Sequence, residues 1–288
     1  MSTTFVTPQA RTVLIRACQG FEELDACVQV QVDVWGYSDG DVIPRRVFTV
    51  TQKIGGQVLA AFDVSDGTDD TSENLVGFAM ALPAVRPQSG PGATPEPYLH
   101  SHMLAVRPEF RNAGIGRRLK LAQREDALAK GFQLMEWTFD PLEIKNSFLN
   151  IHRLGAIVRR YTSNFYGVSS SRLQGGLPTD RLHAEWWMQS ERVEAILSDA
   201  PTVKPNTEQA NQIVTIQETI TVPHEIGKWK SSVENQDRAL AVQSENRQRF
   251  EKAFARGLAV IDFRTDAEGN GIFGLGHWQE PVFSIPRD

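Results

Sequence analysis

The chain has 288 residues, of which 41% are hydrophobic and 23% are charged, and its formal net charge is -5. This length can bury a full core, in one large domain or in two domains of ordinary size. The mildly acidic balance argues against a nucleic-acid-binding protein, because affinity for a phosphate backbone requires concentrated positive charge. Its two cysteines, Cys18 and Cys27, imply no disulfide framework, and we expect both in the core.

The N-terminal segment lacks a basic region followed by an apolar core, as a secretory signal would have. No stretch approaches the run of about eighteen apolar residues that a membrane span requires. We therefore expect a cytoplasmic protein with no membrane partner.

Residues 1–195 alternate between strand-like and helix-like patterns, which predicts a mixed α/β fold. After a loose terminus at 1–10, strands are expected at 12–17, 57–64, 75–82, 98–106, 132–139, 155–161 and 183–189, and helices at 21–35, 45–54, 115–131 and 143–154. Five prolines at 83–97 predict an irregular loop.

Residues 196–288 form a C-terminal extension with a different composition. A linker is expected at 198–212, strands at 213–222, 258–263 and 271–278, and a long polar helix at 236–256. We expect two parts, a domain at 1–195 and a small α/β subdomain at 196–288, whose role the sequence does not specify.

A strand, a turn and a helix around Gly114 and Gly116 form the most informative segment. The apolar run 103–106 suits a buried strand, and Ile115, Leu119, Ala122 and Ala129, widened by Leu121 and Leu128, suggest an apolar helix face. The glycines let the backbone approach a ligand closely, and the unpaired amides of the first helical turn favour a phosphate. A ligand-free turn is the alternative for a bare Gly-x-Gly sequence.

Two other phosphate-binding motifs do not fit this segment. A dinucleotide fingerprint would need a small residue at Leu119, and a P-loop would need Gly-Lys-Ser/Thr, which is absent. The string Arg111-x-x-Gly114-x-Gly116 instead resembles the acyl-CoA signature of the GNAT superfamily of N-acetyltransferases. The strings at 100–106 and 137–142 resemble a longer bacterial subgroup of predicted acetyltransferases.

This resemblance implies a GNAT-like fold over about residues 12–190 and acetyl-CoA as co-substrate. It implies direct attack of an acceptor amine on the thioester in a ternary complex. The acceptor, a small molecule or a peptide, is not identified by the sequence. In relatives the cofactor is gripped by positions that correspond here to Leu104, Val106, Arg111, Asn112, Ala113, Gly114, Ile115, Gly116, Arg117 and Asn146.

His102 is the first candidate for the base that accepts the proton of the acceptor amine. It shares a strand face with His100 if that strand is regular. Glu136, in an otherwise apolar strand, is the second candidate, because burial would raise the pKa of its carboxyl group. All three residues are open to a purely structural interpretation. A metal site at His100 and His102 lacks further ligands at suitable spacing.

The acid that protonates the departing thiolate is harder to place. Relatives carry a tyrosine at a set spacing after the helix asparagine, but here Asn146 is followed at that spacing by Arg153. Tyr161 and Tyr166 follow nearby, and Tyr166 is preferred, although either is open to being a core tyrosine. Asn146 and Asn150 are expected on one helix face beside the pantetheine arm.

Residues 35–44 and 176–181 occupy positions where GNAT relatives bind the acceptor. The missing tyrosine and the unassigned extension leave open a non-catalytic acyl-CoA-binding module. We expect a monomer or a homodimer.

Overall fold

The computed structural model of the protein describes residues 2–37, 40–87, 95–167, 174–198 and 215–281. The chain divides into two units. The first contains Met1–Trp137 and Ser169–Gln174, and the second contains Thr138–Val168 and Gly175–Asp288.

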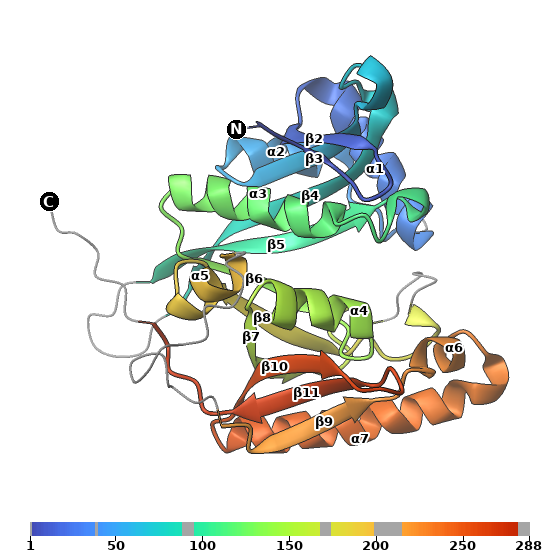
Figure 1. Ribbon diagram of the computed structural model, residues 1–288, viewed down its shortest axis with the longest axis vertical. Coiled ribbons are helices and arrows are strands. Elements are labelled where there is room, and N and C mark those ends of the chain that lie inside the picture. Colours follow the sequence, from blue (N-terminus) through green and yellow to red (C-terminus); the bar gives the residue numbers. More distant parts are fainter. Residues whose placement is uncertain (1, 38–39, 88–94, 168–173, 199–214, 282–288) are drawn as a thin grey trace, which may run out of the picture. The chain divides into compact units, whose positions relative to one another are not determined.

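The sheet of the first unit has the strand order β1-β2-β3-β4-β5-β6 (Figure 1). Its strands are β1 (Ser2–Val6), β2 (Thr12–Ala17), β3 (Gln57–Asp63), β4 (Leu75–Arg86), β5 (Glu96–Val106) and β6 (Leu134–Phe139). Adjacent strands are antiparallel, except that β5 and β6 run parallel. The last residues of β6, Thr138 and Phe139, belong to the second unit.

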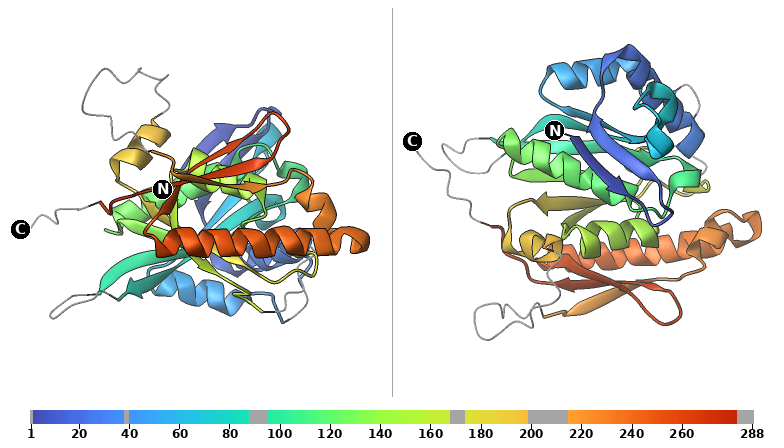
Figure 2. Two further views of the ribbon diagram at one scale, coloured as in Figure 1. Left: turned by 90° about the horizontal axis from the view of Figure 1, so that it is seen from below. Right: turned by 45° about the horizontal axis from the view of Figure 1, so that its top comes forward.

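Helices cover both faces of this sheet. α1 (Gly20–Trp35) and α2 (Arg45–Lys53) bury Leu24, Cys27, Val30 and Phe48 in one cluster with β3, β4 and β5. α3 (Ile115–Ala129) packs in a second cluster with β2, β3 and β4 (Figure 2). The predicted stripe of α3 is confirmed at Ile115 and Leu119, but Ala129 is exposed. The helix also buries Lys120, Gln123 and Ala127.

The sheet of the second unit has the order β8-β7-β10-β11-β9. Its strands are β7 (Ile157–Thr162), β8 (Arg181–Trp187), β9 (Glu218–Val222), β10 (Ala259–Thr265) and β11 (Gly271–Gly276). Its helices are α4 (Ile144–Ser147), a π-helical segment (Phe148–Arg153), α5 (Glu191–Leu197), α6 (Ile226–Lys230) and α7 (Gln236–Ala255). Short 3₁₀ turns in the two units are Ser65–Gly67, Ser72–Asn74, Pro108–Phe110 and Val233–Asn235.

The C-terminal extension is built into the second sheet. β10 pairs with β7 through Val260 and Val158, and α7 packs on β7 and β9. Strands from before and after residue 195 thus lie in one sheet. A division into functional domains at residues 195 and 196 stays a prediction.

Most predicted elements are confirmed within a few residues, and the differences have physical causes. The terminus expected to be loose forms β1, which pairs with β2 through a turn closed by the Ala10 N–H donating to the Thr7 carbonyl at 2.9 Å. The expected loop at 83–97 is shorter, because the β4–β5 ladder extends to Arg86 and Glu96. The linker at 198–212 lies outside the described residues apart from Ser198.

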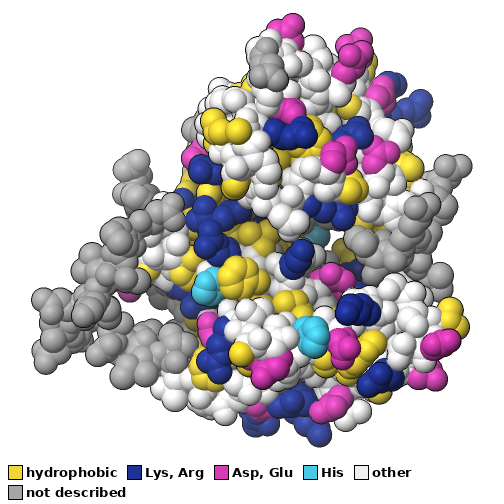
Figure 3. All heavy atoms as spheres, turned by 45° about the vertical axis from the view of Figure 1, so that its right-hand side comes forward, with side chains coloured by type: hydrophobic (Ala, Val, Ile, Leu, Met, Phe, Trp, Pro, Cys, Tyr) yellow, Lys and Arg dark blue, Asp and Glu magenta, His cyan; other side chains and the backbone are white. Residues whose placement is uncertain are grey.

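Both cysteines are buried, as predicted, and their Sγ atoms lie 3.7 Å apart without a disulfide bond. No helix in the described ranges combines the length and apolarity needed to cross a membrane. Basic and acidic side chains are interspersed on the face drawn in Figure 3.

Candidate functional site

The turn between β5 and α3 has an unusual backbone. Asn112 and Gly114 both lie in the left-handed region, with φ of 60° and 80°. Gly114 is the residue before α3, and the first helical hydrogen bond runs from the Arg118 N–H to the Gly114 carbonyl at 3.1 Å. A side chain at Gly114 would meet no atom within 4 Å, so the glycine is required by its backbone angles.

This conformation leaves several backbone amides without an acceptor among the described residues. The N–H groups of Ala113, Gly114, Ile115 and Gly116 donate no hydrogen bond to any part of the chain that the structure describes. They lie at the positive end of the α3 dipole. Consecutive N–H groups in such a turn form a concave site for an anion.

The side chains of this segment divide into packing and ligand-facing groups. Ala113 and Ile115 are buried in the cluster beneath α3, and Leu104 and Val106 pack against the same cluster. These residues therefore offer their backbone rather than their side chains. At Gly116 an added Cβ would lie 3.5 Å from Leu104 Cδ2, an ordinary contact, so the glycine keeps the first turn of α3 open rather than preventing a clash.

Charged and polar side chains surround the amides. Arg111 and Asn112 are exposed, and the Arg111 Nε donates to the Val106 carbonyl at 3.3 Å. Arg117 is half-buried in the first turn of α3. Two guanidinium groups of the predicted signature thus lie at or next to the turn that carries the amides.

The edge of β5 leads from this turn to the catalytic candidates. The parallel ladder with β6 consists of the pairs Leu99–Met135 and His100–Glu136. Beyond His100, no described strand pairs with this side of β5 as far as Val106. An unpaired strand edge offers amides and carbonyls to the amide groups of an extended ligand.

A β-bulge occurs at His102. In the β4–β5 ladder, Met80 pairs with Met103 and Ala81 pairs with Ser101, which leaves His102 as the additional residue. The rings of His100 and His102 lie 6.0 Å apart. His100 is paired with Glu136, so the three candidate residues project to the same side of the sheet. Bulges commonly re-aim side chains next to active sites.

The environment of His102 suits a base. Burial lowers the pKa of its imidazole from the ordinary value of 6.5. The ring is therefore neutral at neutral pH and can accept a proton. Glu136 is 6% exposed, as predicted for a carboxyl group in an apolar strand.

Lys120, Ser101 and Gln123 form a buried polar cluster between α3 and β5 that the sequence interpretation missed. The helix buries every fourth residue from Ile115, and Lys120 lies next to Leu119 at the border of this buried face. That position was the only signal in the sequence that Lys120 is buried. A lysine at such a position is usually assigned to the surface.

Two tyrosines of the second unit have contrasting environments. The Tyr166 hydroxyl lies 3.0 Å from Thr138 Oγ1, and 45% of the residue is exposed. Tyr161 donates to Asp180 Oδ2 at 2.5 Å, and burial, followed by the Asp180 carboxylate, raises its pKa. Asp180 is fully buried and also forms an ion pair with Arg247 on α7 at 2.8 Å. Tyr161 is thus held in a structural network, whereas Tyr166 is accessible.

The two asparagines of the predicted helix are not equivalent. Asn146 is exposed in α4, and Asn150 is buried in the π-helical segment that follows. Arg153 ends that segment. Asn146 and Tyr166 belong to the second unit, so their approach to the turn before α3 stays a prediction.

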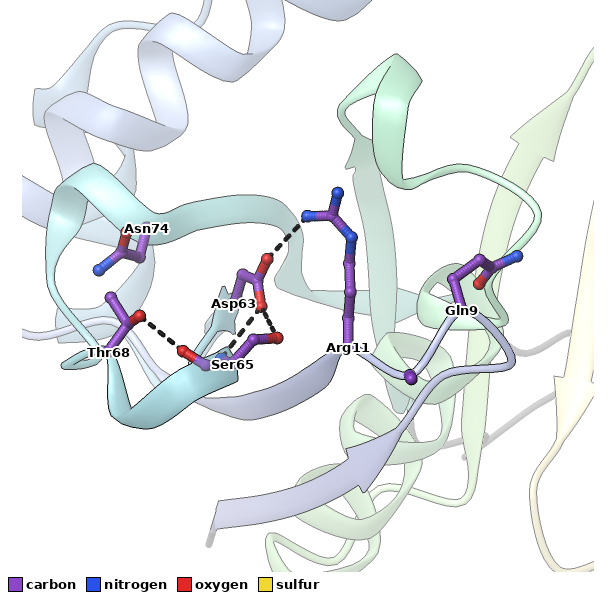
Figure 4. Close-up of a pocket in the computed structure, with 7 residues that line it drawn as sticks. Gln9, Arg11, Asp63, Ser65, Thr68 and Asn74 are labelled. Carbon is purple, nitrogen blue, oxygen red and sulfur yellow. Dashed lines mark hydrogen bonds and ion pairs between the residues drawn. The ribbon is translucent and has the colours of Figure 1, made fainter.

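A polar surface pocket of about 470 Å³ lies elsewhere in the first unit and includes Arg11, Asp63, Ser65 and Thr68 (Figure 4). Its groups bond to one another. Arg11 Nη1 donates to Asp63 Oδ2 at 2.9 Å, and Ser65 Oγ donates to Asp63 Oδ1 at 2.5 Å. We regard it as a stabilised loop cluster. In the described ranges, no group of three or more His, Cys, Asp or Glu side chains is arranged to hold a metal ion.

Comparison with known proteins relates one part of the chain to a known family. Residues 56–146 match the model of the Acetyltransferase (GNAT) family, and this range contains β3 to β6 together with the turn before α3. This part of the chain therefore resembles the GNAT acetyltransferases, as its signature predicted. No curated protein matches the sequence.

Solved structures with a similar fold include further acetyltransferases. NAA60 of Arabidopsis thaliana in complex with acetyl-CoA is 18% identical, with a TM-score of 0.47, over 61% of this chain and 99% of that one. A putative GNAT acetyltransferase from Desulfovibrio desulfuricans is 14% identical, with a TM-score of 0.43, over 61% of this chain and 99% of that one. The putative acetyltransferase yncA of Salmonella typhimurium with acetyl-CoA is 16% identical, with a TM-score of 0.43, over 64% of this chain and 98% of that one.

Proposed function

We propose that this protein transfers an acetyl group from acetyl-CoA to the amine of an acceptor in a ternary complex. The observation that carries the proposal is the row of amides at Ala113, Gly114, Ile115 and Gly116, which have no acceptor in the described chain and lie at the start of α3. This arrangement suits the diphosphate of coenzyme A.

The residues around the amides fit the rest of that molecule. Arg111, Asn112 and Arg117 would supply positive charge and a hydrogen-bonding amide to the phosphates. The unpaired edge of β5 at Leu104 and Val106 would bond the peptide-like amides of the pantetheine arm, and Asn146 is the proposed partner from α4. Acetyl-CoA held in this way supplies an acetyl thioester.

His102 is the proposed base, with Glu136 as the second candidate. His102 takes the proton of the acceptor ammonium, directly or through a water molecule, so that the neutral amine attacks the thioester carbonyl. A carbon–nitrogen bond forms and the carbon–sulfur bond breaks. The departing thiolate receives a proton from the Tyr166 hydroxyl, the proposed acid. The nitrogen of the new amide releases its extra proton to water, and Tyr166 regains a proton from water. Orienting two bound reactants removes about 7 to 11 kcal/mol of the barrier in favourable cases, so placement is the larger contribution of the protein.

The test has two parts. Calorimetric titration with acetyl-CoA should give saturable binding that weakens by roughly tenfold to a hundredfold in Arg111→Ala, because a hydrogen bond to a charged group contributes about 1.5 to 3 kcal/mol. Arg118→Ala is the matched control, since the Arg118 guanidinium lies over the Phe5 ring at 5.1 Å. Equal affinities in the wild type and both variants would refute the assignment of the site.

The second part is a screen of small-molecule and peptide amines, read by release of the coenzyme A thiol. We expect at least one amine to accelerate release. Tight acetyl-CoA binding with no acceptor in either class would instead identify an acyl-CoA-binding module.

A further inference from the structure

Lys120 is buried on the sheet-facing side of α3 and is 3% exposed. Its Nζ donates to Ser101 Oγ at 2.8 Å and lies 3.6 Å from the centre of the Trp137 ring. Ser101 Oγ in turn donates to Gln123 Oε1 at 3.0 Å. The amine is therefore tied to β5 by a chain of hydrogen bonds that begins and ends on α3.

The burial of Lys120 has a cost in free energy. No ion pair joins it to a carboxylate within the described part of the protein, and burial lowers the pKa of its amine well below the ordinary range. Burying an amine without a counter-charge is unfavourable unless its hydrogen bonds are satisfied. An apolar side chain at the same position of α3 would fill the space without the desolvation cost of an amine. The hydrogen bond to Ser101 is therefore the specific contribution of Lys120.

Ser101 lies directly before the bulge at His102. In a regular strand, Ser101 and Met103 would project to the same face. Here Ser101 bonds to α3, whereas Met103 belongs to the cluster beneath α1 and α2. Leu104 packs on the α3 side again. Leu82, the partner of His100, packs on the side of α1 and α2. The His102 ring lies 6.0 Å from the His100 ring, so His102 and Met103 project consecutively to that side.

We propose that Lys120 is a positioning residue for His102, and that it acts by holding Ser101 against α3 so that the bulge stays in register. Without this anchor, β5 can pair regularly with β4, which would turn Ser101 or His102 to the other face. The role of His102 as a base rests on the proposed function, but the link from Lys120 through Ser101 to the bulge does not.

The test is a titration of the His102 ring by NMR in the full-length protein labelled at histidine, with His102→Gln to assign the signal. The variants are Lys120→Met, which keeps the volume of the side chain, and Ser101→Ala, which removes only the hydroxyl group. Lys130→Met is the control, because Lys130 lies just beyond α3 in a surface ion pair with Asp126. The His100 ring, 6.0 Å from the His102 ring, remains its neighbour in every variant.

We expect the pKa of His102 to rise by about half a unit in both test variants, toward its ordinary value, because the ring loses its buried position. The control should leave the titration unchanged. Once an acceptor is known, both test variants should lower kcat by roughly tenfold or more with little change in KM for acetyl-CoA.

An unchanged or lower pKa of His102 in Ser101→Ala, even with a reduced melting temperature, would overturn the proposal and leave Lys120 as a core residue. Ser101→Ala decides the matter if Lys120→Met fails to fold. The titration needs neither acetyl-CoA nor an acceptor. A raised pKa in a protein without transferase activity would thus support the positioning role and reject the proposed function.

Discussion

His100 pairs with Glu136 at the last step of the parallel ladder between β5 and β6. At Leu99 and His100 the backbone of β5 pairs with strands on both sides, and the edge that follows His100 pairs with no strand in the described chain as far as Val106. The pair therefore lies where a buried strand becomes a binding edge. A base at His102 would act next to this junction, and the amides before α3 lie at the far end of the same edge.

Gly114 and Gly131 form a matched pair for testing the anion site. They flank α3, have φ of 80° and 84°, and offer open space to a new side chain. Alanine at either position is strained by the backbone and should lower stability by about 1 kcal/mol or more. Only Gly114→Ala should also weaken acetyl-CoA binding, by roughly tenfold, because it disturbs the exposed amides. Calorimetry and urea unfolding separate the two effects, and equal affinities would count against the site.

His102→Gln should remove an ionisation from the pH dependence of kcat/KM. The pKa of His102 is below 6.5, so the wild-type rate should rise as the pH passes through that lower pKa and level off near neutrality. The variant should be slower by about a hundredfold at neutral pH and lack this rise. A wild-type profile in the variant would favour Glu136 as the base.

Tyr161 and Tyr166 should respond differently to the same substitution. Tyr161→Phe leaves buried Asp180 without one donor and should lower the free energy of unfolding by about 1 to 3 kcal/mol. Tyr166→Phe changes an exposed residue and should alter stability by no more than about 0.5 kcal/mol. If Tyr166 protonates the thiolate, its variant should instead slow acetyl transfer. Chemical unfolding and turnover assays give both quantities, and a Tyr166 variant of normal rate would exclude that role.

His183 should make the fold sensitive to mild acid. Burial, followed by the nearby Arg160 charge, lowers its pKa from 6.5 to about 4, and its Nε2 lies 2.8 Å from Thr162 Oγ1. Between these pH values the unfolded chain binds more protons than the folded chain, so the free energy of unfolding should fall as the pH falls through this window. His183→Gln should reduce that dependence in urea unfolding at a series of pH values. His277→Gln, at an exposed histidine, is the control, and parallel curves for wild type and His183→Gln would contradict the prediction.

The sequence predicted the elements whose signals are local. Strong apolar runs and the glycines at 114 and 116 were sufficient to locate β5, the turn and α3, because their cause lies within a few neighbouring residues. β1 was missed because its alternation is weak and its stability comes from pairing with β2. The bulge at His102 depends on the register of β4, which no single strand encodes.

Long-range contacts explain the remaining differences. The composition of α3 does not show that Lys120 is buried whereas other lysines lie on the surface. Its burial depends on the Ser101 hydroxyl, which belongs to β5. The choice between Tyr161 and Tyr166 likewise depends on Asp180 and Arg247, residues that are distant in the chain. Sequence spacing suggested both tyrosines as the acid. Their environments distinguish them, because Tyr161 is held by Asp180 and Tyr166 is exposed.

The ladder between β7 and β10 bears on the design of shorter fragments. A fragment ending near residue 195 would lose β10 and Arg247, so the edge of β7 would be exposed to solvent and Asp180 would lose its guanidinium partner. Such a fragment should aggregate when expressed. The C-terminal extension thus completes the sheet to which β7 belongs, and its removal would destabilise the residues that remain.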